Sequence, residues 1–114
     1  MSHWYHACRI DDIEPWSGAA ALFSGVQVAL IRSGDDIHAL GNLDPFSGAQ
    51  VIARGIVGDL GGVPVVASPM YKQHFRLSDG VCVEDAQVRL PVYAVRIEHG
   101  DVFVELGATN SSSS

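Results

Sequence analysis

The sequence predicts an all-β domain, built as an antiparallel sandwich or a partly open barrel. Three observations favour this fold class. Short runs rich in Val, Ile, Leu and Tyr recur along the chain, turn-forming residues separate several of them, and no segment has the pattern of a long helix. With 114 residues, 47% of them hydrophobic, the chain fits one small domain, which we place at residues 1–107.

In the first half of the chain, the residue types predict three strands. Tyr5–Ile10 and Val26–Arg32 are apolar runs of strand length, and Ile37–Leu40 is a shorter one. Ser33–Asp36 lies between the second and third runs and contains Gly and Asp, which favour the tight turn of an antiparallel hairpin. Asp11–Pro15 is at most one helical turn, because proline ends it.

In the second half, four more runs have strand character. They are Val63–Ala67, Gln87–Leu90, Val92–Ile97 and Val102–Leu106. His99–Asp101 contains Gly and joins the last two runs, which predicts a closing hairpin with Arg96 and Glu105 on its polar faces.

The remaining segments are not expected to form regular structure. Asp44–Arg54 has some helical character, but Gly48 interrupts the pattern. Asp79–Gly80 is a predicted turn. Residues 108–114 form a Ser-rich tail with nothing apolar to bury, so we expect this tail to be disordered.

The charge balance excludes two classes of partner. The formal net charge is -6, the pI is near 5.1, and only seven Lys and Arg residues are spread along the chain. A surface for nucleic acid or for an anionic membrane would need clustered cations, so neither partner is expected. No run of about 18 apolar residues occurs, and the N-terminus lacks the pattern of a secretory signal. We therefore expect a soluble cytoplasmic protein.

The two cysteines, Cys8 and Cys82, are predicted to be reduced thiols in the core. Each lies in an apolar, strand-like run, and they are too far apart for a Cys-x-x-Cys motif. A disulfide between them is the alternative.

Two segments contain a proline in a similar position, Asp44-Pro45-Phe46 and Ser68-Pro69-Met70-Tyr71. They resemble the two ligand loops of Rieske iron-sulfur domains, which read Cys-Pro-His and Cys-Pro-x-His in that family. Asp44 and Phe46 stand at the first pair of ligand positions, and Ser68 and Tyr71 stand at the second pair. A Rieske cluster requires two thiolates on one iron and two imidazoles on the other. These four residues therefore cannot hold a [2Fe-2S] cluster.

The resemblance becomes specific over longer segments. Gly41–Ala49, Arg54–Asp59 and Ala67–Phe75 resemble the small subunit of assimilatory NAD(P)H-dependent nitrite reductase, a family that keeps the Rieske fold without the cluster ligands. The similarity extends from Trp4 to Leu106. The 21 residues between Phe46 and Ser68 are a longer connection than cluster-binding members usually have, and we expect an extended loop there.

Loss of the cluster would leave a hole in the fold unless side chains fill it. Phe46 and Tyr71 are bulky enough to do so. Asp44 and Ser68 each precede a proline, where a short acceptor side chain commonly stabilises a turn. We therefore expect these two to make local turn contacts.

Other chemistry has little support in the sequence. The five histidines have no paired ligand spacing, so a mononuclear metal site at His38, Asp44 and His74 is not expected. Ser68, His74 and Asp44 or Asp79 could be imagined as a hydrolytic triad, but Ser68 lacks the Gly-x-Ser-x-Gly pattern of a nucleophile elbow. The glycines in Gly58–Gly62 do not match a dinucleotide-binding motif. We predict no catalytic and no metal-binding residue.

The resemblance implies a non-catalytic accessory subunit. Its partner would be the nitrite reductase large subunit, which reduces nitrite to ammonia and is expected to carry FAD, siroheme and [4Fe-4S]. A Rieske-type ferredoxin and a stand-alone Rieske-fold binding module are the alternatives.

The two loops also carry charged and apolar side chains that suit a binding surface. Arg76 adds positive charge, while Met70, Tyr71 and Phe75 are expected to add apolar surface. The residues predicted to bind the partner are Arg54, Lys72, Gln73 and His74.

Overall fold

The computed structural model describes residues 3–106 and confirms the all-β fold. Its larger sheet is antiparallel, with the strand order β1-β9-β8-β4-β3-β2. These strands are β1 (His3–Arg9), β2 (Ser17–Phe23), β3 (Val26–Ser33), β4 (Asp36–Gly41), β8 (Val92–Glu98) and β9 (Asp101–Leu106). The rings of Tyr5 on β1 and Phe23 on β2 stack with their centroids 5.3 Å apart. The two edge strands therefore approach one another, and the sheet is nearly closed into a barrel.

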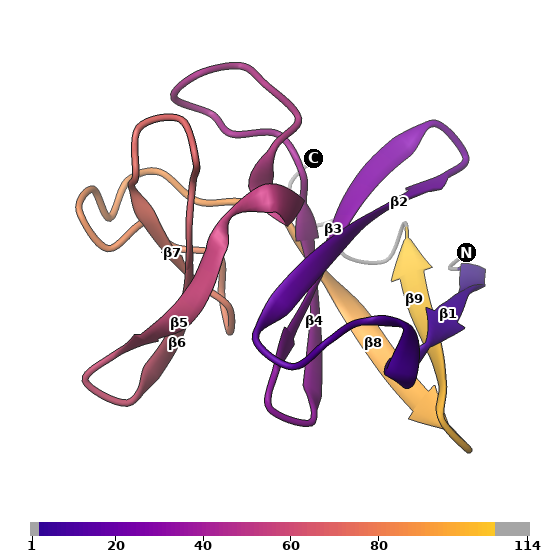
Figure 1. Cartoon of the computed structure of the whole chain (residues 1–114). Coiled ribbons are helices and arrows are strands. Elements are labelled where there is room, and N and C mark those ends of the chain that lie inside the picture. Colours follow the sequence, from indigo (N-terminus) through magenta and orange to yellow (C-terminus); the bar gives the residue numbers. More distant parts are fainter. Residues whose placement is uncertain (1–2, 107–114) are drawn as a thin grey trace.

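A smaller sheet lies beside the barrel (Figure 1). It consists of β5 (Ile56–Leu60), β6 (Val63–Ala67) and β7 (His74–Arg76), in the order β5-β6-β7. Two short 3-10 helices are also present, η1 (Ile10–Asp12) and η2 (Ile52–Arg54). Three further segments matter below: the first loop (residues 43–51), the second loop (residues 68–73) and the strap (residues 80–91), which connects β7 to β8.

Strand β3 of the larger sheet lies between two hydrophobic cores and contributes side chains to both. Val28 and Leu30 point into a core inside the barrel, while Ala29 and Ile31 belong to a second core. Val66 and Phe75 of the smaller sheet complete that second core. Burial on both faces explains why Val28–Ile31 is a continuous apolar run rather than an alternating one.

Every predicted strand except Gln87–Leu90 is confirmed. The Gln87–Leu90 segment belongs to the strap, where only an isolated bridge joins Arg89 to Val81, so this prediction was wrong. The predicted hairpin turn between β8 and β9 is present, with φ of 54° at His99 and 83° at Gly100. Positive φ at both positions suits the tight turns that match the twist of antiparallel strands.

The sequence failed to predict β2, β5 and β7. The connection from Ser47 to Ala67 was expected to be an extended loop, apart from its last strand, but it contains η2 and the β5–β6 hairpin. The predicted tail at residues 108–114 lies outside the described residues.

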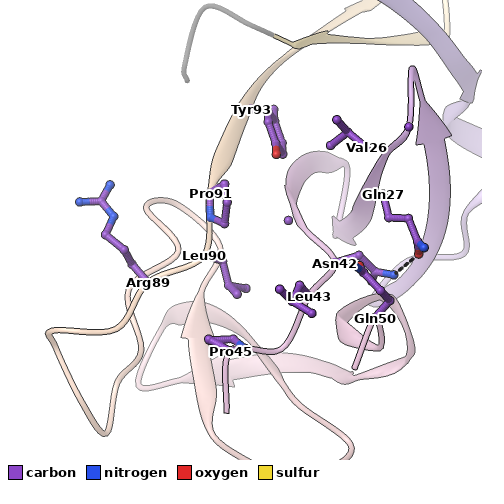
Figure 2. A pocket seen from close by; sticks show the side chains of 12 residues that line it. Val26, Gln27, Asn42, Leu43, Pro45, Gln50, Arg89, Leu90, Pro91 and Tyr93 are labelled. Atoms are coloured by element: carbon purple, nitrogen blue, oxygen red, sulfur yellow. Dashed lines mark hydrogen bonds between the residues drawn. The ribbon is translucent and has the colours of Figure 1, made fainter. Parts of the chain in front are cut away.

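In the described part of the chain, neither helical turn is long or apolar enough to cross a membrane. The surface has a groove of about 410 Å³ where the barrel meets the first loop and the strap (Figure 2). We call it the junction groove. It lies between Val26–Gln27, Gly41–Leu43 and Arg89–Pro91.

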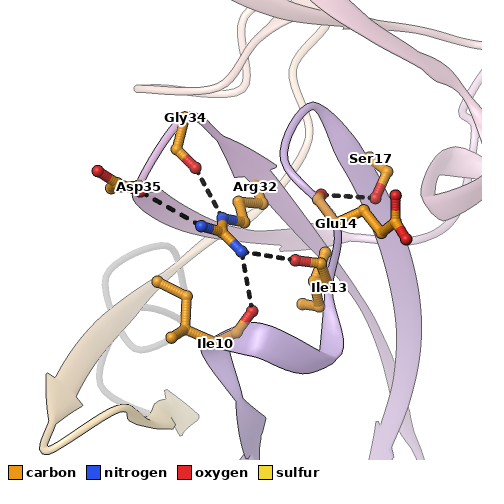
Figure 3. A network of polar contacts seen from close by, with 7 residues as sticks. All are labelled: Ile10, Ile13, Glu14, Ser17, Arg32, Gly34 and Asp35. Carbon is orange, nitrogen blue, oxygen red and sulfur yellow. Dashed lines mark hydrogen bonds and ion pairs between the residues drawn. The ribbon is translucent and has the colours of Figure 1, made fainter.

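Arg32 ties the η1 segment to the β3–β4 hairpin (Figure 3). Its guanidinium donates hydrogen bonds to the carbonyl oxygens of Ile10, Ile13 and Gly34, at 3.2, 2.8 and 2.7 Å. An ion pair with Asp35 completes the network. Only 12% of the Arg32 side chain is exposed, so these contacts are largely shielded from water. They fix the path of the chain between β1 and β2.

Candidate functional site

The first and second loops are joined by a buried hydrogen bond. The Ser68 hydroxyl donates to the Asp44 carboxylate, with 2.6 Å between Ser68 Oγ and Asp44 Oδ2. Asp44 is 0% exposed and Ser68 is 1% exposed. We call this contact the Asp44–Ser68 lock. It links two side chains that are 24 positions apart in the sequence, at the positions where a Rieske domain has its cysteine ligands.

Each partner in the lock also stabilises its own loop. The Phe46 backbone N–H donates to Asp44 Oδ1 at 2.9 Å, and the Met70 backbone N–H donates to Ser68 Oγ at 3.2 Å. Both are the local turn contacts predicted for Asp44 and Ser68, so that prediction is confirmed. The sequence did not predict that the two side chains also bind each other.

The hydrogen bonds keep Asp44 ionised in spite of its burial. Burial by itself raises the pKa of this carboxyl group. The hydrogen bonds from the Ser68 hydroxyl, from the Phe46 N–H and from Ser47 more than offset burial, so the Asp44 pKa lies below its usual value. The lock is therefore a charge-assisted hydrogen bond, a stronger class than a neutral pair.

Phe46 and Tyr71 differ in the roles that they play. Phe46 is half-buried and packs on the second core, with its ring centroid 6.3 Å from that of Phe75. Tyr71 is 60% exposed, so the prediction that it fills the space of a cluster was wrong. The Asp44–Ser68 lock occupies the centre between the loops, and the Tyr71 ring is free to contact solvent or a partner.

The residues present do not fit a Rieske cluster. The four ligand positions hold Asp44, Phe46, Ser68 and Tyr71, none of which is a Cys or His. The two buried polar residues among them, Asp44 and Ser68, are hydrogen-bonded to each other. Within residues 3–106, no group of three or more His, Cys, Asp or Glu side chains is arranged to hold a metal ion.

The side chains considered for other chemistry have different partners. His74 Nδ1 lies 2.6 Å from Glu84 Oε2 on the strap, so His74 contacts Glu84 while Ser68 contacts Asp44. Gly61 and Gly62 form the β5–β6 turn. Cys82 is buried, Cys8 is half-buried, and both are free thiols whose pKa burial raises, as expected for unreactive cysteines.

His38 lies half-buried on β4, where burial lowers its pKa, with its Nε2 3.1 Å from the Ser33 hydroxyl. Above a pH of about 6.5, the usual histidine pKa, the imidazole is neutral in both the folded and the unfolded chain. Below it the unfolded chain takes up the proton first, so this group makes stability fall with falling pH. We expect His38→Gln to reduce the loss of unfolding free energy between about pH 7.5 and about pH 5.5 in urea titrations. An unchanged pH dependence would contradict this.

The four predicted partner-binding residues are placed differently in the structure. Arg54 and Lys72 are exposed. Gln73 is half-buried, and its Oε1 atom is buried without a hydrogen-bond partner among the described residues. His74 is partly buried and contacts Glu84. Phe75, which was expected to add apolar surface, is 0% exposed, so that prediction was wrong.

Ion pairs separate the cations into two groups. All seven Lys and Arg residues of the chain lie within the described part. Four form ion pairs with carboxylates: Arg9, Arg32, Arg76 and Arg96. The other three, Arg54, Lys72 and Arg89, have no ion pair within residues 3–106, and all three are exposed. Sequence reasoning missed Arg89, because it lies in a segment that was assigned to a strand.

The three unpaired cations lie in or next to segments that contact the two loops. Arg54 precedes Gly55, whose Cα lies so close to the Ala67 carbonyl oxygen that an added Cβ would overlap it. Lys72 is in the second loop, and Arg89 lines the junction groove together with Pro45 of the first loop. Residues 43–54 and 67–78 contain a single carboxylate, the buried Asp44. Two further carboxylates at this end, Asp79 and Glu84, contact Arg76 and His74, so Arg54 and Lys72 are the cations there without a carboxylate partner among the described residues.

Comparison with known proteins identifies the family. The model of the Rieske-like [2Fe-2S] domain matches residues 3–105. The nitrite reductase (NADH) small subunit of Salmonella typhimurium is 46% identical over 104 residues, which cover 90% of this chain and 96% of that protein. A crystal structure of an NADH-dependent nitrite reductase small subunit from Mycobacterium tuberculosis superposes with a TM-score of 0.90 at 47% identity, covering 95% of this chain and 98% of that chain.

A third relative is a much longer protein. The nitrite reductase [NAD(P)H] large subunit of Klebsiella oxytoca is 42% identical over 101 residues, which are 89% of this chain but only 11% of that protein. The Salmonella and Mycobacterium relatives, in contrast, are matched over nearly their whole length. On these similarities, the chain belongs to the family of nitrite reductase small subunits, whose fold is that of the Rieske-like [2Fe-2S] domain.

Proposed function

We propose that this chain is a non-catalytic accessory subunit of NAD(P)H-dependent nitrite reductase and that it binds the large subunit through its two locked loops. The large subunit carries out the reduction of nitrite to ammonia in the cytoplasm, with FAD, siroheme and [4Fe-4S] as its cofactors. The observation that carries the proposal is the buried Asp44–Ser68 lock. It holds two loops rigid at the place where a related domain would hold a redox centre.

The relative from Klebsiella oxytoca supports the choice of partner. In that protein, a region 42% identical to this chain belongs to the large subunit polypeptide itself. Fusion into one chain keeps two domains at a high effective concentration, which favours a contact between them. A separate small subunit of the same family must make the equivalent contact by binding.

Charge supports the choice of surface. The exposed cations Arg54 and Lys72 lie at the loops, and neither has a carboxylate partner in the described part of the chain. Met70 is 50% exposed and Tyr71 is 60% exposed beside them, and Met, Tyr and Arg are enriched at interfaces. This combination suits a partner surface that is acidic around an apolar centre.

Charge reversal tests this surface. We expect Arg54→Glu and Lys72→Glu together to weaken binding to the large subunit by about tenfold or more, because each change removes an attraction and adds a repulsion. The measurement is calorimetric titration of the purified large subunit at two salt concentrations. The wild-type affinity should fall with salt, and the variant should depend on salt much less.

The barrel provides a matched control. Arg96→Glu reverses a charge on β8, where the wild-type Arg96 pairs with Glu98, and should leave the affinity unchanged. If the loop variant binds like the wild type, the loops are not the docking surface.

Iron analysis of the chain purified alone tests the ferredoxin alternative, since a stoichiometric cluster would overturn the accessory role. Nitrite-dependent NAD(P)H oxidation with and without the chain measures any effect on catalysis.

A further inference from the structure

The lining of the junction groove holds one cation and no carboxylate, on a domain that is acidic overall. None of the twelve residues that line it is acidic, although the chain carries 13 Asp and Glu. Arg89 is its only cation among the described residues and has no ion pair there. Figure 2 shows Arg89 at the outer rim, with its guanidinium directed away from the other side chains drawn, and the residue is exposed. Its charge contributes, after the hydrogen bond from Arg76, to lowering the pKa of Asp79, but its exposed guanidinium can still contact an anionic group at the rim.

The polar side chains on the opposite wall present a hydrogen-bond donor. The Ala53 backbone N–H donates to Asn42 Oδ1 at 2.8 Å, which fixes the orientation of the Asn42 amide. Asn42 Nδ2 must then donate to Gln27, and the accepting atom is Gln27 Oε1 at 3.3 Å. The Nε2 group of the exposed Gln27 has no hydrogen-bond acceptor among residues 3–106, so its donors can bind a partner. An occupant of the groove should therefore offer acceptors.

The centre of the groove is apolar. Val26 is 37% exposed and Leu43 is 46% exposed, and Figure 2 shows both facing the same open space as Tyr93. Pro91 can line this space because β4 has glycine at position 41, where an added Cβ would lie 2.8 Å from Pro91 Cδ. Pro45 and Pro91 have no backbone N–H, so they add apolar surface without a donor that needs a partner.

The volume of the groove indicates the size of the segment that it can hold. One turn of an α-helix about 10 Å across, with a pitch of about 5.4 Å, occupies about 420 Å³. The groove has about 410 Å³, about the volume of a single helical turn, so it suits a short segment better than a long helix. A short extended segment fits, with one apolar side chain in the centre. Pro45 belongs to the first loop, so the groove is continuous with the proposed docking surface.

We propose that the junction groove binds an extended, acidic segment of the nitrite reductase large subunit, with a carboxylate at Arg89 and an apolar side chain on Val26 and Leu43. This inference rests on the proposed function, because it takes the large subunit as the partner. It adds a second contact to the loop surface and defines its chemistry. The carbonyl and carboxylate oxygens of this segment accept hydrogen bonds from Gln27 and Arg89.

Site-specific photo-crosslinking tests this contact. A benzoylphenylalanine is placed in the full chain at Val26 in the groove, at Met70 in the second loop, or at Ile97 on β8, where the native side chain is 40% exposed. Each variant is irradiated with the purified large subunit, and the crosslinked peptide is identified by mass spectrometry. We expect the groove position to capture one contiguous large-subunit segment that contains Asp or Glu. The β8 position should capture nothing.

The outcomes separate the two proposals. If the Met70 position crosslinks to the large subunit and the Val26 position does not, the groove proposal fails while the proposed function stands. If neither position crosslinks, the proposed docking surface fails as well. Capture at Val26 of a second copy of this chain, or of a segment without Asp or Glu, also overturns the groove proposal.

A matched pair of neutral variants adds a quantitative test. Arg89→Gln removes the groove cation, and Arg96→Gln removes a cation at the other end of the β8 region. We expect Arg89→Gln to weaken binding of the large subunit by about three- to tenfold, as for the loss of one interfacial charge, and Arg96→Gln to change it by less than about twofold. Equal effects of the two changes would contradict a specific role for Arg89.

Discussion

Replacement of Asp44 by Ala is expected to lower the free energy of unfolding by about 3 kcal/mol. The change removes charge-assisted hydrogen bonds from the Ser68 hydroxyl and from the Phe46 N–H, each worth about 1.5–3 kcal/mol, and leaves the Ser68 hydroxyl buried without this acceptor. It also removes a carboxylate whose burial is itself unfavourable, so the net loss is less than the sum. Urea unfolding followed by circular dichroism measures the difference.

A double-mutant cycle separates the Asp44–Ser68 lock from the turn contacts that each residue makes alone. Ser68→Ala removes the hydroxyl, and the combined variant removes both partners. We expect the two single losses to exceed the loss in the combined variant by about 1–2 kcal/mol, because both single changes break the same hydrogen bond. Strict additivity would mean that the two side chains do not stabilise each other.

The pH dependence has a defined sign. The Asp44 pKa is lower in the folded chain than its usual value, so the contribution of this carboxylate is fully present above about pH 3.9, the unfolded value. It is lost as the pH falls through the folded pKa. Asp44→Asn, which cannot titrate, should remove this part of the acid-induced loss of stability.

The second large effect is expected at Gly80, at the start of the strap. Its φ is 75°, and an added Cβ would overlap the carbonyl oxygen of Leu90. The Leu90 N–H donates to the Gly80 carbonyl oxygen at 2.8 Å, and the Gly80 N–H donates to the Arg76 carbonyl oxygen at 2.8 Å. The strap cannot move away without breaking these bonds. We expect Gly80→Ala to lower the free energy of unfolding by about 3 kcal/mol and the Tm by about 10–20 °C.

Gly34 provides the matched control for this change. It has a similar φ of 63°, but an added Cβ would meet nothing within 4 Å. Gly34→Ala therefore measures the backbone strain alone, which we expect to be about 1 kcal/mol. Equal losses at both positions would show that the close approach of the strap to Gly80 contributes nothing.

The strands that sequence reasoning found are those whose residue types favour strands in isolation. β3 and β9 are rich in Val, Ile and Leu. β2 reads Ser-Gly-Ala-Ala-Ala-Leu-Phe, with low intrinsic strand preference, and it is held by its full register with β3. β5 includes Gly58 and Asp59, and its hairpin partner β6 supplies the missing stability. Tertiary pairing outweighs local preference at both strands.

The site was predictable where it depends on local contacts. The turn roles of Asp44 and Ser68 follow from their position before proline, and both are present. The lock depends on a contact across 24 residues that no local pattern encodes. Phe75 was misplaced because β7 was not predicted: in a strand, side chains alternate between the two faces, which buries Phe75 between His74 and Arg76.

The most direct test of the account is the affinity of Asp44→Ala for the large subunit. Asp44 is 0% exposed and cannot touch a partner, so it affects binding only by holding the loops in place. In calorimetric titrations at a temperature where the variant is folded, we expect binding about tenfold weaker than wild type, while Gly34→Ala binds normally. Wild-type affinity in folded Asp44→Ala would contradict the claim that the lock organises the docking surface.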